Sequence, residues 1–203
     1  MQSHDHSPLQ VAIFSPYPER LAAAIESTGD WVIVFNGDDP RAFRSPVDWI
    51  VSYGYRKIID PAAYPTARGR LVNLHISLLP WNRGADPNFW SWFDDTPKGV
   101  TLHHIDKGLD TGAIVAAREV AFDPADETLG SSYDKLQEAA CALFRDVWPG
   151  LRRGEVPSIP QSGAGSYHRR AQREAIWDRF PLGWDTPVSE VREYGRKARL
   201  GSA

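Results

Sequence analysis

The sequence predicts an α/β protein, with a mostly parallel central sheet flanked by helices and a small C-terminal appendage. Strand-like and helix-like segments alternate along the first half of the chain, which is typical of parallel sheets with right-handed crossovers. A chain of 203 residues suits one domain with a sizeable core. Because a loop of small residues and a basic patch follow Val156, we expect a main domain at residues 1–155 and the appendage at residues 156–203.

The first half contains three short apolar runs that read as strands, at residues 11–14, 31–35 and 48–53. Gly, Pro, Asn and Asp residues bound them, as expected for strand ends. Between the first two, residues 19–27 predict a helix with Leu21 and Ile25 on one side.

The next apolar run, residues 71–75, predicts a central strand. Residues two apart in a strand share a face, so Asn73 and His75 point the same way. A polar loop and a further strand at 99–105 follow, and that strand leads into an acidic turn carrying Asp106 and Asp110. Ligands bind at strand ends of this kind in open α/β sheets.

The second half continues the pattern. Residues 86–93 predict a short helix with Asp86 as its cap and Pro87 at its first position. Residues 113–120 predict a strand, and residues 128–148 a long amphipathic helix that begins at Thr128. Pro149 and Gly154 are expected to end or kink this helix.

Asn, His and Asp brought together on strand ends suit acyl transfer to an amine. An Asn amide and a protonated His stabilise the oxyanion that forms during attack. His and Asp can move the proton that the amine must lose. His103 and His104 face opposite ways in a strand, so at most one can reach this site, and each is more often structural.

At these residues the chain resembles the folate-dependent formyltransferases. The resemblance covers roughly residues 10–150 and is closest to bacterial sugar N-formyltransferases and to the formylation domain of peptide synthetases. Ile76 departs from the pattern, because many relatives have Pro there. The matched positions are Asn73, His75, Ser77 to Pro80, Arg83-Gly84, Gly99-Val100-Thr101 and Asp110-Thr111-Gly112.

The resemblance implies a Rossmann-like formyltransferase fold and an enzyme that takes its formyl group from 10-formyltetrahydrofolate, with no metal. It implies that Asn73 and His75 polarise the formyl oxygen, and that Asp110 orients His75 and relays the proton. By position, the expected folate contacts are Tyr53, Gly54, Tyr55, Ile58, Asp106 and Leu109, and the expected acceptor contacts are Trp81, Asn82 and Arg83.

The acceptor suggested by the resemblance is the amine of a nucleotide-linked amino sugar for surface-glycan biosynthesis. One alternative is an amino acid on a carrier protein in peptide biosynthesis, docked on Arg169, Arg170 and Arg173. Another is a folate-binding module without catalysis. Initiator-tRNA formylation is disfavoured because the chain is too short for the further domain of such enzymes. The purine-pathway enzyme is disfavoured because SPYPER, after the first strand, lacks a glycine-rich phosphate loop.

Composition limits the partners and the cellular compartment that fit this protein. A net charge of −3 gives no electrostatic case for nucleic acid or a membrane surface. The single Cys141 excludes an internal disulfide and fits a reducing compartment. The polar start of the chain, with His4 and His6, lacks the apolar core of a secretory signal. We therefore expect a cytoplasmic protein, in which the charged tail at residues 188–200 is a candidate contact for a homodimer.

Overall fold

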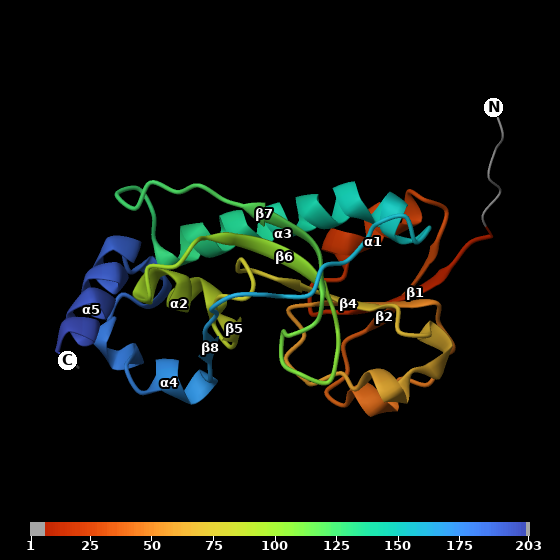
Figure 1. Ribbon diagram of the computed structural model, residues 1–203, viewed down its shortest axis with the longest axis horizontal. Helices are drawn as coiled ribbons and strands as arrows, with labels where there is room; N and C mark the ends of the chain where they lie inside the picture. The colour runs from red at the N-terminus through yellow and green to blue at the C-terminus, as the bar shows by residue number, and fades with distance from the viewer. Residues whose placement is uncertain (1–6, 202–203) are drawn as a thin grey trace.

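The computed structural model describes residues 7–201, and a six-stranded sheet of order β2-β1-β3-β4-β6-β7 forms its centre (Figure 1). The strands β2, β1, β3 and β4 run parallel, whereas β6 is antiparallel to β4 and β7 to β6. This confirms the predicted mostly parallel sheet. Its strands are β1 (Gln10–Phe14), β2 (Trp31–Phe35), β3 (Trp49–Tyr53), β4 (Leu71–His75), β6 (Gly99–His104) and β7 (Ile114–Glu119). His4 and His6 lie outside the described residues.

Two helices, α1 and α3, cover one face of the sheet (Figure 1). The opposite face packs against the segments 36–48 and 54–67, through Phe43, Val47, Ile59 and Tyr64. The helices are α1 (Glu19–Glu26), α2 (Pro87–Phe93), α3 (Leu129–Leu151), α4 (Arg170–Glu174) and α5 (Val188–Leu200).

The long helix α3 begins as the sequence predicts. The Thr128 hydroxyl accepts from the Ser131 N–H at 3.1 Å, and the Ser131 hydroxyl accepts from the Thr128 N–H at 2.9 Å, which is a reciprocal N-terminal cap. The helix continues past Pro149 and ends at Leu151, before Gly154, three residues beyond the predicted Trp148. A proline in the last turn removes only its own N–H bond, and the turn survives.

The cap predicted for α2 is wrong. Pro87 is the first helical residue, but Asp86 adopts φ +54° and its side chain makes no capping hydrogen bond. Its carboxylate instead lies 2.8 Å from Nε of Arg173. The tail helix α5 packs on α2 and buries Val188 and Val191 there, so its apolar side is used within the chain.

Residues 156–201 lie against the loop that follows β4. The two-residue strand β8 (Tyr167–His168) pairs with β5 (Arg83–Gly84), and Ile159 pairs with Ile114. The C-terminal segment is therefore folded back on the main domain, while the boundary at 155/156 stays a prediction. Among residues 7–201, no helix is both long and apolar enough to cross a bilayer.

An ion pair connects the end of α3 with the chain just before β1 and β2. Arg152, just after α3, places Nε and Nη2 each 2.6 Å from the Asp30 carboxylate, which also accepts from the Leu9 N–H and the Thr28 hydroxyl. Burial alone would raise the pKa of Asp30, but these four hydrogen bonds outweigh it and lower that pKa.

Asp30→Asn should therefore lower the free energy of unfolding at pH 7 by about 3 kcal/mol, because the buried Arg152 charge loses its partner. A lowered folded pKa means that wild type keeps this contribution above the ordinary carboxyl pKa and loses it as pH falls through the folded value. Urea unfolding of wild type and Asp30→Asn at neutral and acidic pH measures this difference in the free energy of unfolding. The difference between them should shrink in acid, and the exposed control Asp146→Asn should change little. An equal difference at both pH values would contradict this assignment.

Candidate active site

The carboxyl end of β4 carries the two polar side chains that the sequence singled out. Val72 and Leu74 point into the core under α1 and α3, while Leu71 points to the other side. Asn73 and His75 therefore share the face of Leu71, as predicted. The direction of these two side chains is fixed because β4 packs on the core and pairs with β3 on one edge and β6 on the other.

Asp110, in the turn between β6 and β7, brings its carboxylate between them. Oδ1 accepts from Nδ2 of Asn73 at 3.4 Å, and Oδ2 lies 3.7 Å from Nδ1 of His75. The backbone N–H of Gly84 donates to Oδ2 at 2.8 Å and fixes the carboxylate. The structure thus brings together all three residues that the sequence placed at the reaction centre.

The charge of Asp110 is strongly stabilised. Burial by itself would raise the pKa of this carboxyl, whose side chain is only 11% exposed. The neighbouring His75 and His103 rings and the Gly84 N–H outweigh burial and hold the pKa of Asp110 well below its ordinary value. A carboxylate is therefore present across the neutral range, beside an imidazole and an amide.

The orientation of His75 is set by the loop that follows β4. Its Nε2 lies 2.9 Å from the carbonyl oxygen of Asn82, and since a carbonyl only accepts, Nε2 carries the proton there. Nδ1 faces Asp110 at a distance too long for a direct hydrogen bond but close enough for charge attraction. A proton on Nδ1 would make the ring a cation that Asp110 stabilises and would leave that N–H free for a substrate oxygen.

His103 is the site residue that sequence reasoning left unassigned. Its Nδ1 donates to the carbonyl of His104 at 2.8 Å, and its Nε2 lies 3.2 Å from Nδ2 of Asn73 and 3.6 Å from Oδ1 of Asp110. When the ring is neutral with its proton on Nδ1, Nε2 accepts from the Asn73 amide. His103 also lies directly opposite Asn73 in the antiparallel register of β4 and β6. That register is the signal that could have selected His103 over His104.

The other motif residues hold the loop in place. Thr101 donates its hydroxyl proton to the carbonyl of Ser77 at 2.7 Å and accepts from the N–H of Leu79 at 3.1 Å. The Ser77 hydroxyl donates to the carbonyl of Trp81 at 2.7 Å. The serine and threonine of the two motifs thus tie the loop to β6, which fixes the Asn82 carbonyl against His75.

Two residues from the C-terminal segment complete this scaffold, and neither was predicted. Gln161 donates to the carbonyls of Asp110 and Gly112, both at 2.8 Å, while its side-chain oxygen accepts from Arg83. Ser166 accepts from the N–H of Asn82 at 2.8 Å. No local sequence signal marks either residue, because each acts on a loop far away in the chain.

The predicted acceptor contacts lie in that loop. Asn82 is fully buried, and its side chain donates to Thr96 and accepts from Ser166. Contact between a substrate and the Asn82 side chain is therefore not available here, and only its carbonyl faces the site. Arg83 is half-buried and held by Gln161, and Trp81 is half-buried.

The predicted folate contacts divide into two groups. Gly54 follows β3 beside the end of β4, and Asp106 accepts from Gly108 and Thr111, which shapes the turn where Leu109 is 44% exposed. Three others lie differently. The Tyr53 side chain is buried under α3, Tyr55 donates to the Gly37 carbonyl at 2.7 Å, and Ile58 is 79% exposed at a hollow beside Tyr64.

No group of three or more His, Cys, Asp or Glu side chains within residues 7–201 is arranged to hold a metal ion. The polar groups gathered at the site are the amide of Asn73, the imidazoles of His75 and His103, and the carboxylate of Asp110.

Known proteins of similar sequence and fold include formyltransferases. The formyltransferase PseJ from Anoxybacillus kamchatkensis, solved with UDP-4,6-dideoxy-4-formamido-L-AltNAc and tetrahydrofolate, is 41% identical, with a TM-score of 0.84 over 92% of this chain and 99% of that one. A sugar N-formyltransferase from Shewanella (20% identity, TM-score 0.68, 84% and 80% of the two chains) shares the fold. So does the N-formyltransferase of Helicobacter canadensis, solved with folinic acid and dTDP-3-aminofucose (18% identity, TM-score 0.66, 80% and 70%).

The sequence model of the formyl transferase family matches residues 41–148, which span β3, β4, β6 and the Asp110 turn. This match covers more than half of the chain and includes every polar group at the reaction centre. With PseJ similar over nearly the full length of both chains, the conclusion is direct: this protein belongs to the formyl transferase family.

Proposed function

We propose that this protein is an N-formyltransferase that moves the formyl group of 10-formyltetrahydrofolate to the primary amine of a nucleotide-linked amino sugar. The observation that carries the proposal is the buried Asp110 carboxylate held between His75 and Asn73 by the Gly84 N–H. The likeness to PseJ, whose structure holds a formylated amino-sugar nucleotide and tetrahydrofolate, supports both substrates.

The residues present fit the folate donor. Gly54 follows β3 beside the end of β4, and Asp106 and Leu109 lie in the turn that carries Asp110. Leu109 offers an exposed apolar side chain for a flat ring. These three would hold the donor, which supplies an activated formyl group when bound. The buried phenol of Tyr53 is turned away, so a folate contact at that position would be through the backbone.

In the proposed mechanism, the acceptor amine attacks the formyl carbon and a carbon–nitrogen bond forms. One N–H of Asn73, released from its long 3.4 Å contact with Asp110, and the Nδ1–H of protonated His75 stabilise the negative charge that develops on the formyl oxygen. Asp110 faces Nδ1 of His75 and takes a proton from the attacking nitrogen. The bond from the formyl carbon to the folate nitrogen then breaks, and that nitrogen receives the proton. The products are a formamide and tetrahydrofolate.

The acceptor class is tested by a panel assay. Purified protein and 10-formyltetrahydrofolate would be incubated with 3-amino and 4-amino sugar nucleotides and with a carrier-bound amino acid, and tetrahydrofolate release followed by absorbance. We expect turnover with a sugar nucleotide. Arg173, one of three basic residues considered for a carrier protein, is engaged by Asp86, which favours the sugar. Turnover only with the carrier-bound amino acid would overturn the proposed acceptor.

We also propose His103 as a positioning residue. His103→Phe removes the acceptor that holds the Asn73 amide, so kcat should fall about tenfold, the equivalent of one lost hydrogen bond of about 1.4 kcal/mol, with little change in KM. His103→Gln, which can accept from Asn73 again, should recover part of the loss. A purely structural role for His103 would instead lower thermal stability in both variants and leave kcat unchanged in the folded fraction.

A further inference from the structure

Five residues other than glycine have a positive φ within the described chain, residues 7–201. This left-handed backbone costs free energy in any residue with a Cβ, so it persists only where surrounding contacts hold it. Side chains of the C-terminal segment (residues 156–201) contact four of the five, and these four have φ between +54° and +56°. The contacted residues and their partners are Asn82 with Ser166, Asp86 with Arg173, Asp95 with Arg192 and Asp110 with Gln161.

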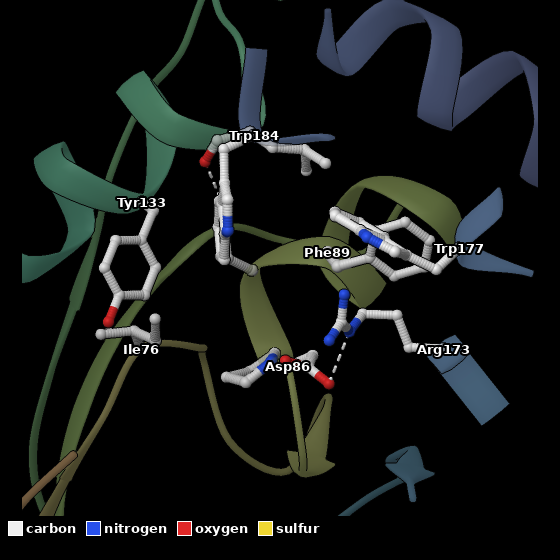
Figure 2. Close-up of a pocket in the computed structure, with 10 residues that line it drawn as sticks. Ile76, Asp86, Phe89, Tyr133, Arg173, Trp177 and Trp184 are labelled. Atoms are coloured by element: carbon white, nitrogen blue, oxygen red, sulfur yellow. Dashed lines mark hydrogen bonds and ion pairs between the residues drawn. The ribbon is translucent and has the colours of Figure 1, made fainter. Parts of the chain in front are cut away.

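Two of these contacts lie at the ends of α2. In Figure 2, Arg173 of α4 reaches Asp86, the residue before the helix, and its Nε lies 2.8 Å from Oδ2. Nη2 of Arg192 lies 2.8 Å from Oδ2 of Asp95, two residues after the helix. These two ion pairs therefore fix the ends of a helix, and both aspartates stand outside the cluster of Asn73, His75 and Asp110.

The other two contacts hold the two residues that face the nitrogens of His75. Asn82 places its carbonyl oxygen 2.9 Å from Nε2 of His75, while its N–H donates to the Ser166 hydroxyl at 2.8 Å. Asp110 places Oδ2 3.7 Å from Nδ1 of His75, while its carbonyl accepts from Nε2 of Gln161 at 2.8 Å. The C-terminal segment thus holds both partners of the imidazole in the backbone conformation that aims them at the ring.

Gln161 uses its whole hydrogen-bonding capacity in these contacts. Nε2 donates to the carbonyls of Asp110 and Gly112, both at 2.8 Å. The side-chain oxygen accepts from Nε and Nη2 of Arg83, at 3.1 and 2.7 Å. A side-chain amide offers two donors and two lone pairs, and all four are engaged. Gln161 therefore joins the Asp110 turn to Arg83, and the next residue, Gly84, donates the N–H that fixes the carboxylate.

We infer that Gln161 is a positioning residue: by holding the backbone of Asp110, it aims the carboxylate at Nδ1 of His75. It acts through Asp110 rather than on the substrates. Without its two N–H donors, the carbonyls of Asp110 and Gly112 lose this partner, and the turn relaxes from the left-handed conformation. The carboxylate moves with the turn. The effect on turnover rests on the proposed function, in which Asp110 takes a proton from the attacking amine.

Steady-state kinetics of Gln161→Glu and Gln161→Leu test the inference. Gln161→Glu keeps an oxygen for Arg83 but has no N–H for the two carbonyls, so kcat should fall about tenfold or more, with little change in KM. Gln161→Leu also has no N–H and carries no charge, and its kcat should fall to a similar extent. A loss common to both variants cannot come from the release of Arg83 or from the added charge. Unchanged kcat in the folded protein of either variant would overturn the inference.

Arg192→Ala is the matched control, because it removes the same kind of contact from Asp95, a residue outside the reaction centre. The Arg192 side chain is 48% exposed, so the variant should fold normally and keep the kcat of wild type. Thermal unfolding of all three variants shows how far each is destabilised. A fall in kcat of Arg192→Ala equal to that of Gln161→Glu would overturn the inference, because the loss would then reflect a general loosening of the C-terminal segment.

Amide hydrogen exchange separates the inference from the proposed function. The Gly84 N–H donates to Asp110 at 2.8 Å, and the Ala85 N–H donates to the His168 carbonyl at 2.9 Å. In NMR of isotope-labelled protein, Gln161→Leu should lose protection at Gly84 and keep it at Ala85, whether or not the protein transfers a formyl group.

Lost protection at Gly84, in a protein that formylates no amine, would refute the proposed function and leave the positioning role standing. Formyl transfer by wild type, with kcat and Gly84 exchange both unchanged in Gln161→Leu, would refute the positioning role and leave the proposed function standing.

Discussion

Replacing His75 by alanine should lower kcat for formyl transfer by roughly 10²- to 10³-fold, the usual cost of one lost oxyanion donor. The ring is 6% exposed and held by the Asn82 carbonyl, and its Nδ1 faces Asp110. The neighbouring His103 offers no Nδ1 proton in its place, because that proton is engaged by the carbonyl of His104.

Steady-state kinetics of purified His75→Ala, with circular dichroism to check folding, measures this loss. His104→Ala is the matched control, because it removes an imidazole from the same region without touching Asp110, and it should change turnover little. Since the lowered pKa of Asp110 keeps its charge through neutral pH, the loss should not be recovered by raising or lowering the assay pH within that range. Near-normal turnover in folded His75→Ala would remove His75 from the mechanism.

Gly84→Ala is expected to damage both stability and catalysis. Gly84 has φ +91°, and an added Cβ would overlap the carbonyl oxygen of His168 and crowd the Tyr167 ring. The loop must then shift, and the N–H that fixes Asp110 moves with it. We expect a loss of about 3 kcal/mol or more in the free energy of unfolding, and a fall of at least about tenfold in kcat/KM at a temperature where the variant is folded.

Gly163→Ala separates the conformational cost of a positive φ from the steric clash at Gly84. Gly163 has a similar φ of +84° but nothing within 4 Å of an added Cβ, so it should lose only the conformational cost of about 1–2 kcal/mol and keep full activity. Urea unfolding and kcat/KM of both variants give the comparison. Equal effects of the two substitutions would mean that close packing of β5 against β8 is not what positions Asp110.

Local patterns predicted the parts of this protein that depend on neighbouring residues. In residues 71–75, side chains alternate between the two faces of the strand, and Val72 and Leu74 pack into the core. Asn73 and His75 could therefore be placed together on the other face. The Thr128 cap was predictable because the bonds of a cap close within three residues.

Long-range contacts account for what the sequence did not predict. Asp is a residue type that often caps helices, but the Asp86 carboxylate pairs with Arg173, 87 positions later, and not with the N-terminus of α2. Gln161 and Ser166 support the site only because residues 156–168 fold back over the loop after β4. His103 was missed because choosing between adjacent histidines requires the register of β4 and β6.

We expect the Asn73, His75 and Asp110 cluster to transfer a formyl group to an amino sugar. Proton NMR of a mixture of wild-type protein, 10-formyltetrahydrofolate and a UDP-linked 4-amino sugar tests it most directly, with Asp110→Asn run in parallel. We predict that a formamide proton signal appears on the sugar with wild type, and that Asp110→Asn, folded and able to bind the donor, yields almost none. A wild-type protein that binds the donor but forms no formamide, or an Asp110→Asn variant as active as wild type, would contradict the account.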